Sequence, residues 1–131
     1  MGTAASSRGI AIVLKRHKPS IRIVAIEPPE WPVARGGQPG PHKIEGVGIG
    51  YTPPLYEPAL VDMVVAVKTD DAKEMARRIA REEALFAGTS FGANVVAALQ
   101  VAEKLGPNAK VVSLMADSGL KYVSTEAYRR S

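Results

Sequence analysis

The stretch that decides the fold is "DMVVAVKTDDAKEMARRIAREEALFAGTSFGANVVAALQVAEKLG", residues 62–106, because its hydrophobic pattern changes twice. The apolar, β-branched run at 62–67 is typical of a buried strand. Residues 69–87 place apolar side chains on one face at helical spacing, which predicts an amphipathic helix. Residues 90–105 are almost entirely apolar and predict a second helix that other elements must cover on most sides. Apolar strands alternating with helices indicate an α/β fold with a parallel sheet.

Hydroxyl side chains and glycines mark the expected ends of these helices. Thr69 and Ser90 each have a hydroxyl that can cap a helix N-terminus. Gly88 is the predicted stop of the first helix, and Gly106 followed by Pro107 is the predicted stop of the second.

Further elements extend the pattern on both sides of this stretch. Residues 21–28, "IRIVAIEP", predict a strand closed by proline, and residues 109–116, "AKVVSLMA", predict a third strand. A helix is expected to begin with Ser6 as its cap and to end before Pro19. The long Gly/Pro-rich segment 29–58 has no periodicity, which is typical of a functional or disordered loop.

The expected order is therefore helix, strand, long loop, strand, helix, helix and strand. Ligands of parallel α/β sheets bind at the carboxyl ends of the strands, so residues 27–29, 67–69 and 117–119 are the candidate positions. The length of 131 residues suits one domain, and we expect residues 1–131 to form it. The first helix has no strand before it, which indicates a part of a larger α/β unit.

Composition excludes several classes of function. The chain has no cysteine, which excludes disulfides, thiolate catalysis and cysteine-ligated metals, and favours a reducing compartment such as the cytoplasm. Its net charge of +4 lies in separate basic spots without interleaved aromatic residues, so no nucleic-acid binding is expected. The amino-terminal residues do not read as a signal peptide. The uncharged residues 84–102 contain a break at "GTSFG" and predict a buried helix, not a membrane span.

Three motifs carry a resemblance to a known family: "GPHKIEGVGIG" at 40–50, "REEALFAGTSFGA" at 81–93 and "DSGLKYVST" at 117–125. Together they make the chain resemble the C-terminal part of cysteine synthase (O-acetylserine sulfhydrylase) and cystathionine β-synthase. These are pyridoxal-phosphate (PLP) enzymes of fold type II, the tryptophan-synthase-β fold. The resemblance covers nearly all of this chain and under half of the family's length, so it implies a partial version of that fold: a parallel sheet with flanking helices.

The resemblance implies a phosphate-binding loop directly before the first helix. The family has Gly-Thr-Gly-Gly-Thr there, and this chain has Gly2, Thr3, Ala4, Ala5 and Ser6. Backbone N–H groups and short hydroxyls at a helix N-terminus bind a phosphate dianion. Thr3 and Ser6 keep the hydroxyls, whereas the alanines replace glycines and can block close approach or a positive φ. The alternative is that these residues only cap the helix.

Ser118 matches the family's serine that hydrogen-bonds the pyridine nitrogen of the cofactor. A neutral hydroxyl does not keep that nitrogen protonated, which suits β-elimination and β-replacement. The alternative is an ordinary turn serine, because Asp-Ser-Gly is common in turns. The resemblance also places Gly46 and Gly48 beside the cofactor and substrate, whereas His42 is best interpreted as making a structural hydrogen bond.

The family's catalytic lysine, which forms the Schiff base with PLP, belongs to the N-terminal part and has no counterpart here. None of the eight lysines stands in that context; they are residues 15, 18, 43, 68, 73, 104, 110 and 121. We therefore assign no catalytic residue and no metal ligand, and expect PLP to bind this chain without a covalent bond.

Three hypotheses remain open. The chain is a fragment or shortened gene product with little activity alone, or a separate chain supplies the N-terminal half and the pair converts O-acetylserine and sulfide to cysteine. The third hypothesis is a non-catalytic module that binds a partner such as serine acetyltransferase. Because the sheet lacks strands, an apolar edge or face should be exposed, and a homodimer would bury it.

Overall fold

A computed structural model describes residues 2–32, 34, 36–37, 40, 44 and 51–129. The chain forms two compact units. Unit 1 consists of Met1–His42 and Gly46–Ala66, and unit 2 of Lys43–Glu45 and Val67–Ser131. The single domain expected from the length stays a prediction, and each unit is described by itself.

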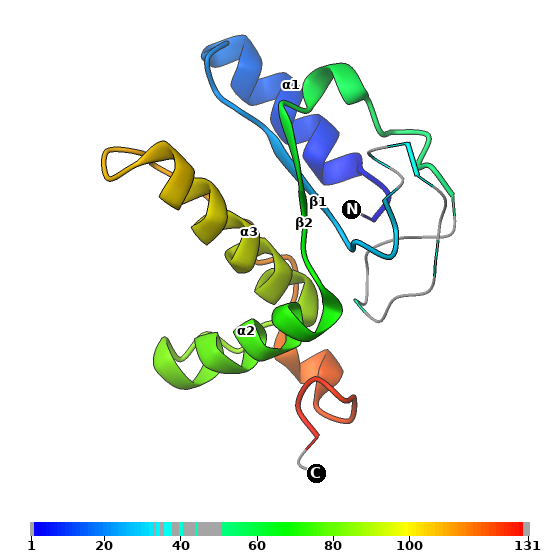
Figure 1. The fold of residues 1–131 in the computed structure, drawn as a ribbon, viewed down its shortest axis with the longest axis vertical. Coiled ribbons are helices and arrows are strands. Elements are labelled where there is room, and N and C mark those ends of the chain that lie inside the picture. Colours follow the sequence, from blue (N-terminus) through cyan, green and yellow to red (C-terminus); the bar gives the residue numbers. More distant parts are fainter. Residues whose placement is uncertain are drawn as a thin grey trace. The chain divides into compact units, whose positions relative to one another are not determined.

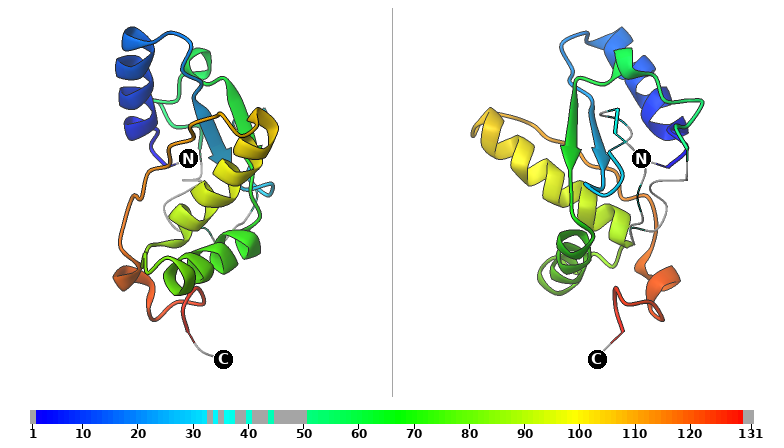
Figure 2. Two further views of the ribbon diagram at one scale, coloured as in Figure 1. Left: turned by 90° about the vertical axis from the view of Figure 1, so that its left-hand side faces the viewer. Right: turned by 45° about the vertical axis from the view of Figure 1, so that its right-hand side comes forward.

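Unit 1 is built on a small parallel sheet (Figures 1 and 2). Its elements are α1 (Ala5–His17), β1 (Val24–Glu27), the 3-10 helix η2 (Pro58–Leu60) and β2 (Met63–Ala66). The strands pair in parallel from Val24 opposite Met63 to Glu27 opposite Ala66. Both strands were predicted, with longer bounds, and the α/β class with a parallel sheet is confirmed.

The start of α1 differs from the expectation that Ser6 caps it. The N-cap residue is Ala4, whose φ of 65° and ψ of 3° are left-handed, and Ser6 lies inside the first turn. The chain thus turns into the helix through its backbone and not through a side-chain cap. The last turn carries Lys15, Arg16 and His17, whose cationic side chains complement the helix dipole.

Unit 2 is a pair of closely packed helices followed by a turn. Its elements are α2 (Thr69–Glu82), α3 (Thr89–Leu105) and the 3-10 helix η3 (Gly119–Tyr122). Figure 1 shows α2 and α3 meeting near the start of α3. A Cβ atom on Gly92 would lie only 2.0 Å from the carbonyl oxygen of Ala72. Glycine on α3 therefore lets the two helix backbones approach each other directly.

The apolar core of unit 2 gathers where α2 meets α3. Ile79, Ala87 and Phe91 are buried, and Met75 and Val95 pack against them. The later part of α3 is not covered as the sequence predicts, since Leu99 there is 56% exposed. Within the described residues, no helix is both long enough and apolar enough to cross a bilayer.

Helix ends in unit 2 fall one or more residues from their predicted positions. The N-cap residues are Lys68 and Gly88, so the hydroxyls of Thr69 and Ser90 lie inside the helices and not at the caps. Both N-cap residues are extended and neither makes a side-chain cap hydrogen bond. The backbone therefore becomes helical before the residue chosen from its hydroxyl.

Gly88 begins α3 and does not end α2, which corrects the predicted stop. α2 already ends at Glu82, and Ala84 then adopts a left-handed φ of 56°. Gly106, with a φ of 84°, follows the last residue of α3 as predicted.

The third strand expected at residues 109–116 is absent, so that prediction is wrong. Strands exist by pairing, and within the described residues β1 and β2 pair only with each other. Its apolar side chains stay exposed: Val112 by 94% and Leu114 by 51%. The segment therefore carries exposed apolar side chains, whereas the exposed edge or face expected of an incomplete sheet stays a prediction.

Candidate functional site

The predicted phosphate-binding residues lie at the start of α1 in unit 1. Ala4 is buried and left-handed, a conformation that glycine adopts readily and alanine only at a cost. This alanine therefore has the backbone conformation that a glycine would favour. The side chains of Thr3 and Ser6 are exposed, so their hydroxyls are open to a ligand.

The first turn of α1 is suited to an anion. Its backbone N–H groups have no acceptor within the helix, as at every helix N-terminus. The Ala5 N–H lies 3.5 Å from Thr3 Oγ1, at the limit for a hydrogen bond. No acidic side chain stands in this turn. Free N–H groups and two open hydroxyls are the donors that a phosphate dianion needs.

The carboxyl end of β1 is one of the candidate ligand positions, and the residue there has a structural role. Glu27 is 2% exposed, and its Oε2 accepts a 2.7 Å hydrogen bond from the Ala34 N–H. Tyr56 donates to the Ala34 carbonyl, and the pKa of Tyr56 is raised by burial and by the charge of Glu27. This carboxylate therefore orders the chain that follows β1.

Ser118 in unit 2 lies in a defined turn. It is the N-cap residue of η3, and its Oγ accepts a 3.2 Å hydrogen bond from the Leu120 N–H. A hydroxyl has one proton to donate and can also accept. Because this hydrogen bond uses the oxygen as acceptor, the Ser118 proton stays available for an acceptor such as an unprotonated pyridine nitrogen.

Two short segments hold the Ser118 turn in place. Ser118 forms an isolated antiparallel bridge with Ala87, and the Gly119 N–H donates to the Phe86 carbonyl at 3.0 Å. A Cβ atom on Gly119 would lie 2.6 Å from the Phe86 ring, so glycine is needed for this approach. The Tyr128 hydroxyl donates to the Ala87 carbonyl. The backbone at Ser118 is therefore fixed by unit 2 itself.

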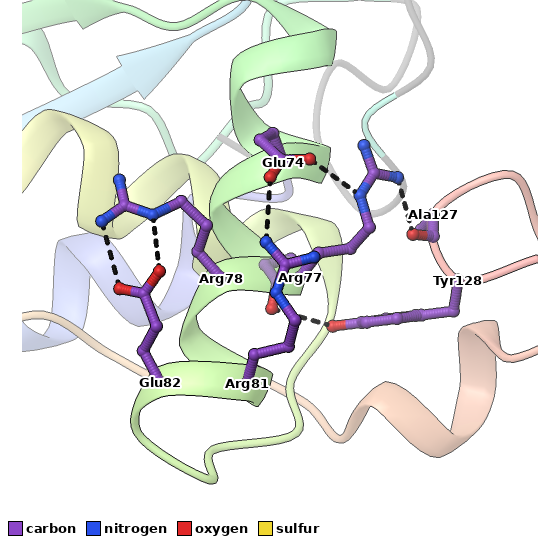
Figure 3. A network of polar contacts seen from close by, with 8 residues as sticks. Glu74, Arg77, Arg78, Arg81, Glu82, Ala127 and Tyr128 are labelled. Atoms are coloured by element: carbon purple, nitrogen blue, oxygen red, sulfur yellow. Dashed lines mark hydrogen bonds and ion pairs between the residues drawn. The ribbon is translucent and has the colours of Figure 1, made fainter.

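The segment after this turn is attached to α2, as Figure 3 shows. Arg77 donates to the Ala127 carbonyl at 2.9 Å and also pairs with Glu74, which in turn binds Arg81. The hydrogen bond from Arg77 is the main cause that lowers the pKa of Glu74. Tyr128 lies beside this group, and burial raises its pKa.

Sequence reasoning missed the residues that anchor the Ser118 turn. The Tyr122 hydroxyl donates to Asp117 Oδ2, and Asp117 Oδ1 lies 2.4 Å from the position that a Cβ on Gly88 would occupy. The Asp-Ser-Gly motif was a signal for the turn. The approach of Gly88 had no signal, because it depends on how the chain folds back.

The most buried lysine in the described part of the chain is engaged elsewhere. Lys73 is 7% exposed, and its ammonium pairs with Glu126 at 2.9 Å. Lys15, in unit 1, pairs with Asp62 at 2.7 Å. Lys43 lies outside the described residues.

The predictions at Gly46 and Gly48, and the interpretation of His42, also lie outside the described residues. Among the residues that the structure describes, no three histidine, aspartate or glutamate side chains gather in a way that could hold a metal ion.

Comparison with known proteins places these features in a family. Residues 1–117 match the family model described as "Pyridoxal-phosphate dependent enzyme". Cysteine synthases from Staphylococcus aureus strains Mu50 and N315 are 44% identical over 128 residues, which is 98% of this chain and 41% of theirs. The chain thus spans less than half the length of these relatives.

Solved structures agree with the sequence matches. Cysteine synthase from Entamoeba histolytica is similar with a TM-score of 0.93 and 35% identity, over 100% of this chain and 39% of that one. The O-acetylserine dependent cystathionine beta-synthase from Helicobacter pylori gives a TM-score of 0.90 and 32% identity, over 98% of this chain and 42% of that one. The predicted resemblance to this family is confirmed.

Proposed function

The chain belongs to the family of pyridoxal-phosphate dependent enzymes, and we propose that it is the cofactor-holding C-terminal part of a cysteine synthase-like enzyme. The observation that carries the proposal is the 44% identity to cysteine synthases over 98% of the chain. The complete enzyme would make cysteine from O-acetylserine and sulfide by β-replacement. PLP, when bound, supplies the electron withdrawal that this replacement needs.

Unit 1 would hold the phosphate. The N–H groups of the first turn of α1 and the hydroxyls of Thr3 and Ser6 are the donors, and the exposure of both hydroxyls supports this role. The left-handed backbone at Ala4 supports it as well, because a glycine-type loop conformation persists although the residue is alanine. Ala4 and Ala5 add methyl groups to this loop, so weaker phosphate binding than in glycine-containing relatives is part of the proposal.

Unit 2 would hold the pyridine nitrogen through Ser118. Its hydroxyl keeps a proton to donate, since its oxygen accepts from the Leu120 N–H. A neutral hydroxyl donates to an unprotonated nitrogen and does not act as a counter-ion for a protonated one. The role of Ser118 is therefore to orient the ring and to leave its nitrogen uncharged.

We further propose that this chain is inactive alone, because none of its lysines stands in the sequence context of the family's Schiff-base lysine. The ion pairs of Lys73 and Lys15 support this view, since their amines are already engaged with carboxylates. A second polypeptide with the lysine-bearing part of the fold would complete the enzyme. The location is proposed to be the cytoplasm, as the cysteine-free composition predicts.

The exposed apolar run at residues 109–116 favours such a partner. Val111, Val112, Leu114 and Met115 are all exposed, and the run is not part of the sheet that the structure describes. Apolar exposure of this kind is typical of an interface. A homodimer that buries this apolar run is the alternative to such a partner. A non-catalytic binding module is the alternative function.

The test is to mix the purified chain with a polypeptide that carries the N-terminal part of a cysteine synthase relative. Cysteine formation from O-acetylserine and sulfide is expected only in the mixture. The same polypeptide with its catalytic lysine replaced is the control and should give none. A mixture that associates by light scattering but forms no cysteine would favour the binding module, and cysteine formation by this chain alone would contradict the proposal.

A further inference from the structure

Asp117 is a half-buried carboxylate to which the proposed function assigns no role. Its Oδ1 is buried and has no hydrogen-bond partner in the described part of the chain, whereas its Oδ2 accepts from the Tyr122 hydroxyl. Burying a carboxylate is costly unless its surroundings compensate. The position of this side chain therefore calls for a physical reason.

The N-terminus of α3 supplies part of that reason. Asp117 Oδ1 lies against Gly88, the N-cap residue of a helix with 17 residues. Helix N-termini carry a partial positive charge, which stabilises a nearby carboxylate. Gly88 has no side chain to displace it, and its φ of −75° is one that any residue can adopt. Glycine is needed there for space and not for backbone freedom.

The anchor at Asp117 also determines where the next side chain points. Ser118 is extended, with a φ of −87° and a ψ of 143°. Asp117 is fixed against Gly88, and the oxygen of Ser118, the next residue in the chain, accepts from the Leu120 N–H.

We propose that Asp117 and Tyr122 are positioning residues that set the Ser118 hydroxyl towards the ring nitrogen of the cofactor. This inference rests on the proposed function of Ser118. Asp117 and Tyr122 do not touch the cofactor in this scheme; they act through Ser118. Tyr122 fixes the carboxylate, the carboxylate fixes the extended backbone, and the backbone fixes the hydroxyl.

The first experiment needs no cofactor. Amide hydrogen exchange in the full chain should show faster exchange of the Leu120 N–H in Tyr122→Phe than in wild type, because its acceptor, Ser118 Oγ, is no longer held. Gly88→Ala should do the same by displacing the carboxylate. Val123→Ala, which changes an exposed neighbour of Tyr122, is the control and should leave this exchange unaltered. Unchanged exchange in both anchor variants would overturn the inference and leave the proposed function intact.

The second experiment uses PLP labelled with ¹⁵N in the ring. Its dissociation constant and its ring-nitrogen chemical shift are measured on wild type, Tyr122→Phe, Ser118→Ala and the double variant. Loss of one hydrogen bond should weaken binding about 5-fold in Ser118→Ala. Tyr122→Phe should give a similar loss and the same direction of ¹⁵N shift, and the double variant should be no worse than Ser118→Ala.

Each outcome of the second experiment has one meaning. Additive losses in the double variant would show that Tyr122 acts without Ser118, and would overturn the inference alone. Wild-type binding that Ser118→Ala does not weaken would contradict the proposed role of Ser118 and, with it, this inference. Absence of PLP binding by the wild-type chain would also contradict both the proposed role of Ser118 and this inference.

Discussion

Gly92→Ala should destabilise unit 2, because the added methyl group would enter the backbone of α2. A Cβ on Gly92 would lie 2.0 Å from the Ala72 carbonyl oxygen and 2.8 Å from the Ala76 nitrogen. Ordinary van der Waals contact begins at 3.4 Å, so the oxygen would have to move by 1.4 Å. Both neighbours are helix backbone atoms, and no side-chain rotation can relieve the overlap.

The expected loss follows from two opposing effects. Overpacking a well-filled contact costs about 1–3 kcal/mol, and a rigid backbone neighbour places this site at the upper end. Alanine is a better helix former than glycine by about 1 kcal/mol, which offsets part of the cost. Moving α3 away would also uncover Ala72 and Ala76, which are now fully buried. We expect the free energy of unfolding to fall by about 2 kcal/mol.

Gly9→Ala is the matched control. Gly9 lies inside α1, is exposed, and has no atom within 4 Å of the position of an added Cβ. The same substitution should therefore stabilise α1 by about 1 kcal/mol through helix propensity alone. Urea unfolding followed by circular dichroism gives the overall effect, and hydrogen exchange of α1 and α3 amides assigns it to a unit. If the Gly92→Ala variant were as stable as wild type, the close contact of α2 with α3 would be refuted.

Three further predictions concern single side chains. Ala4→Gly should raise the free energy of unfolding by roughly 0.5–1 kcal/mol, because glycine removes the strain of the left-handed conformation and the greater entropy of its unfolded chain offsets only part of that gain. A lower free energy of unfolding in urea would contradict the strain at Ala4. The pKa of Asp62 is lowered by the hydrogen bond from the Ile23 N–H and by Lys15, so its stabilising effect is full above about pH 4 and is lost as the pH falls through the folded-state pKa. Asp62→Asn should flatten the acid part of the stability profile, and an unchanged profile would contradict this. Tyr128→Phe should cost about 1 kcal/mol in urea unfolding, because the buried Ala87 carbonyl loses its donor; no change would show that this hydrogen bond is without effect.

The main elements of the fold could be predicted because their signals are local. The β-branched runs at both strands and the helical spacing of Met75 and Ile79 each lie within one short window of sequence. Hydroxyl caps were misplaced at Ser6, Thr69 and Ser90, since several neighbouring residues can serve as the cap and only the folded backbone selects one.

The segment at 109–116 shows where local signals fail. Its composition is that of a strand, but a strand forms only beside another, and within the described residues the sheet consists of β1 and β2 alone. The surroundings of Ser118 show the same limit. The Asp-Ser-Gly turn was visible, whereas the anchors at Gly88 and Phe86 come from a distant segment that no pattern connects to it.

Borohydride reduction in the presence of PLP, followed by peptide mapping, tests the central claim most directly. The claim is that this polypeptide holds the cofactor by its phosphate and its ring nitrogen but has no lysine placed to bond it. The account predicts that reduction leaves none of this chain's lysines carrying a stoichiometric cofactor adduct, whereas the lysine of an added N-terminal polypeptide becomes labelled in the mixture. A stoichiometric adduct on one lysine of the isolated chain would contradict the account.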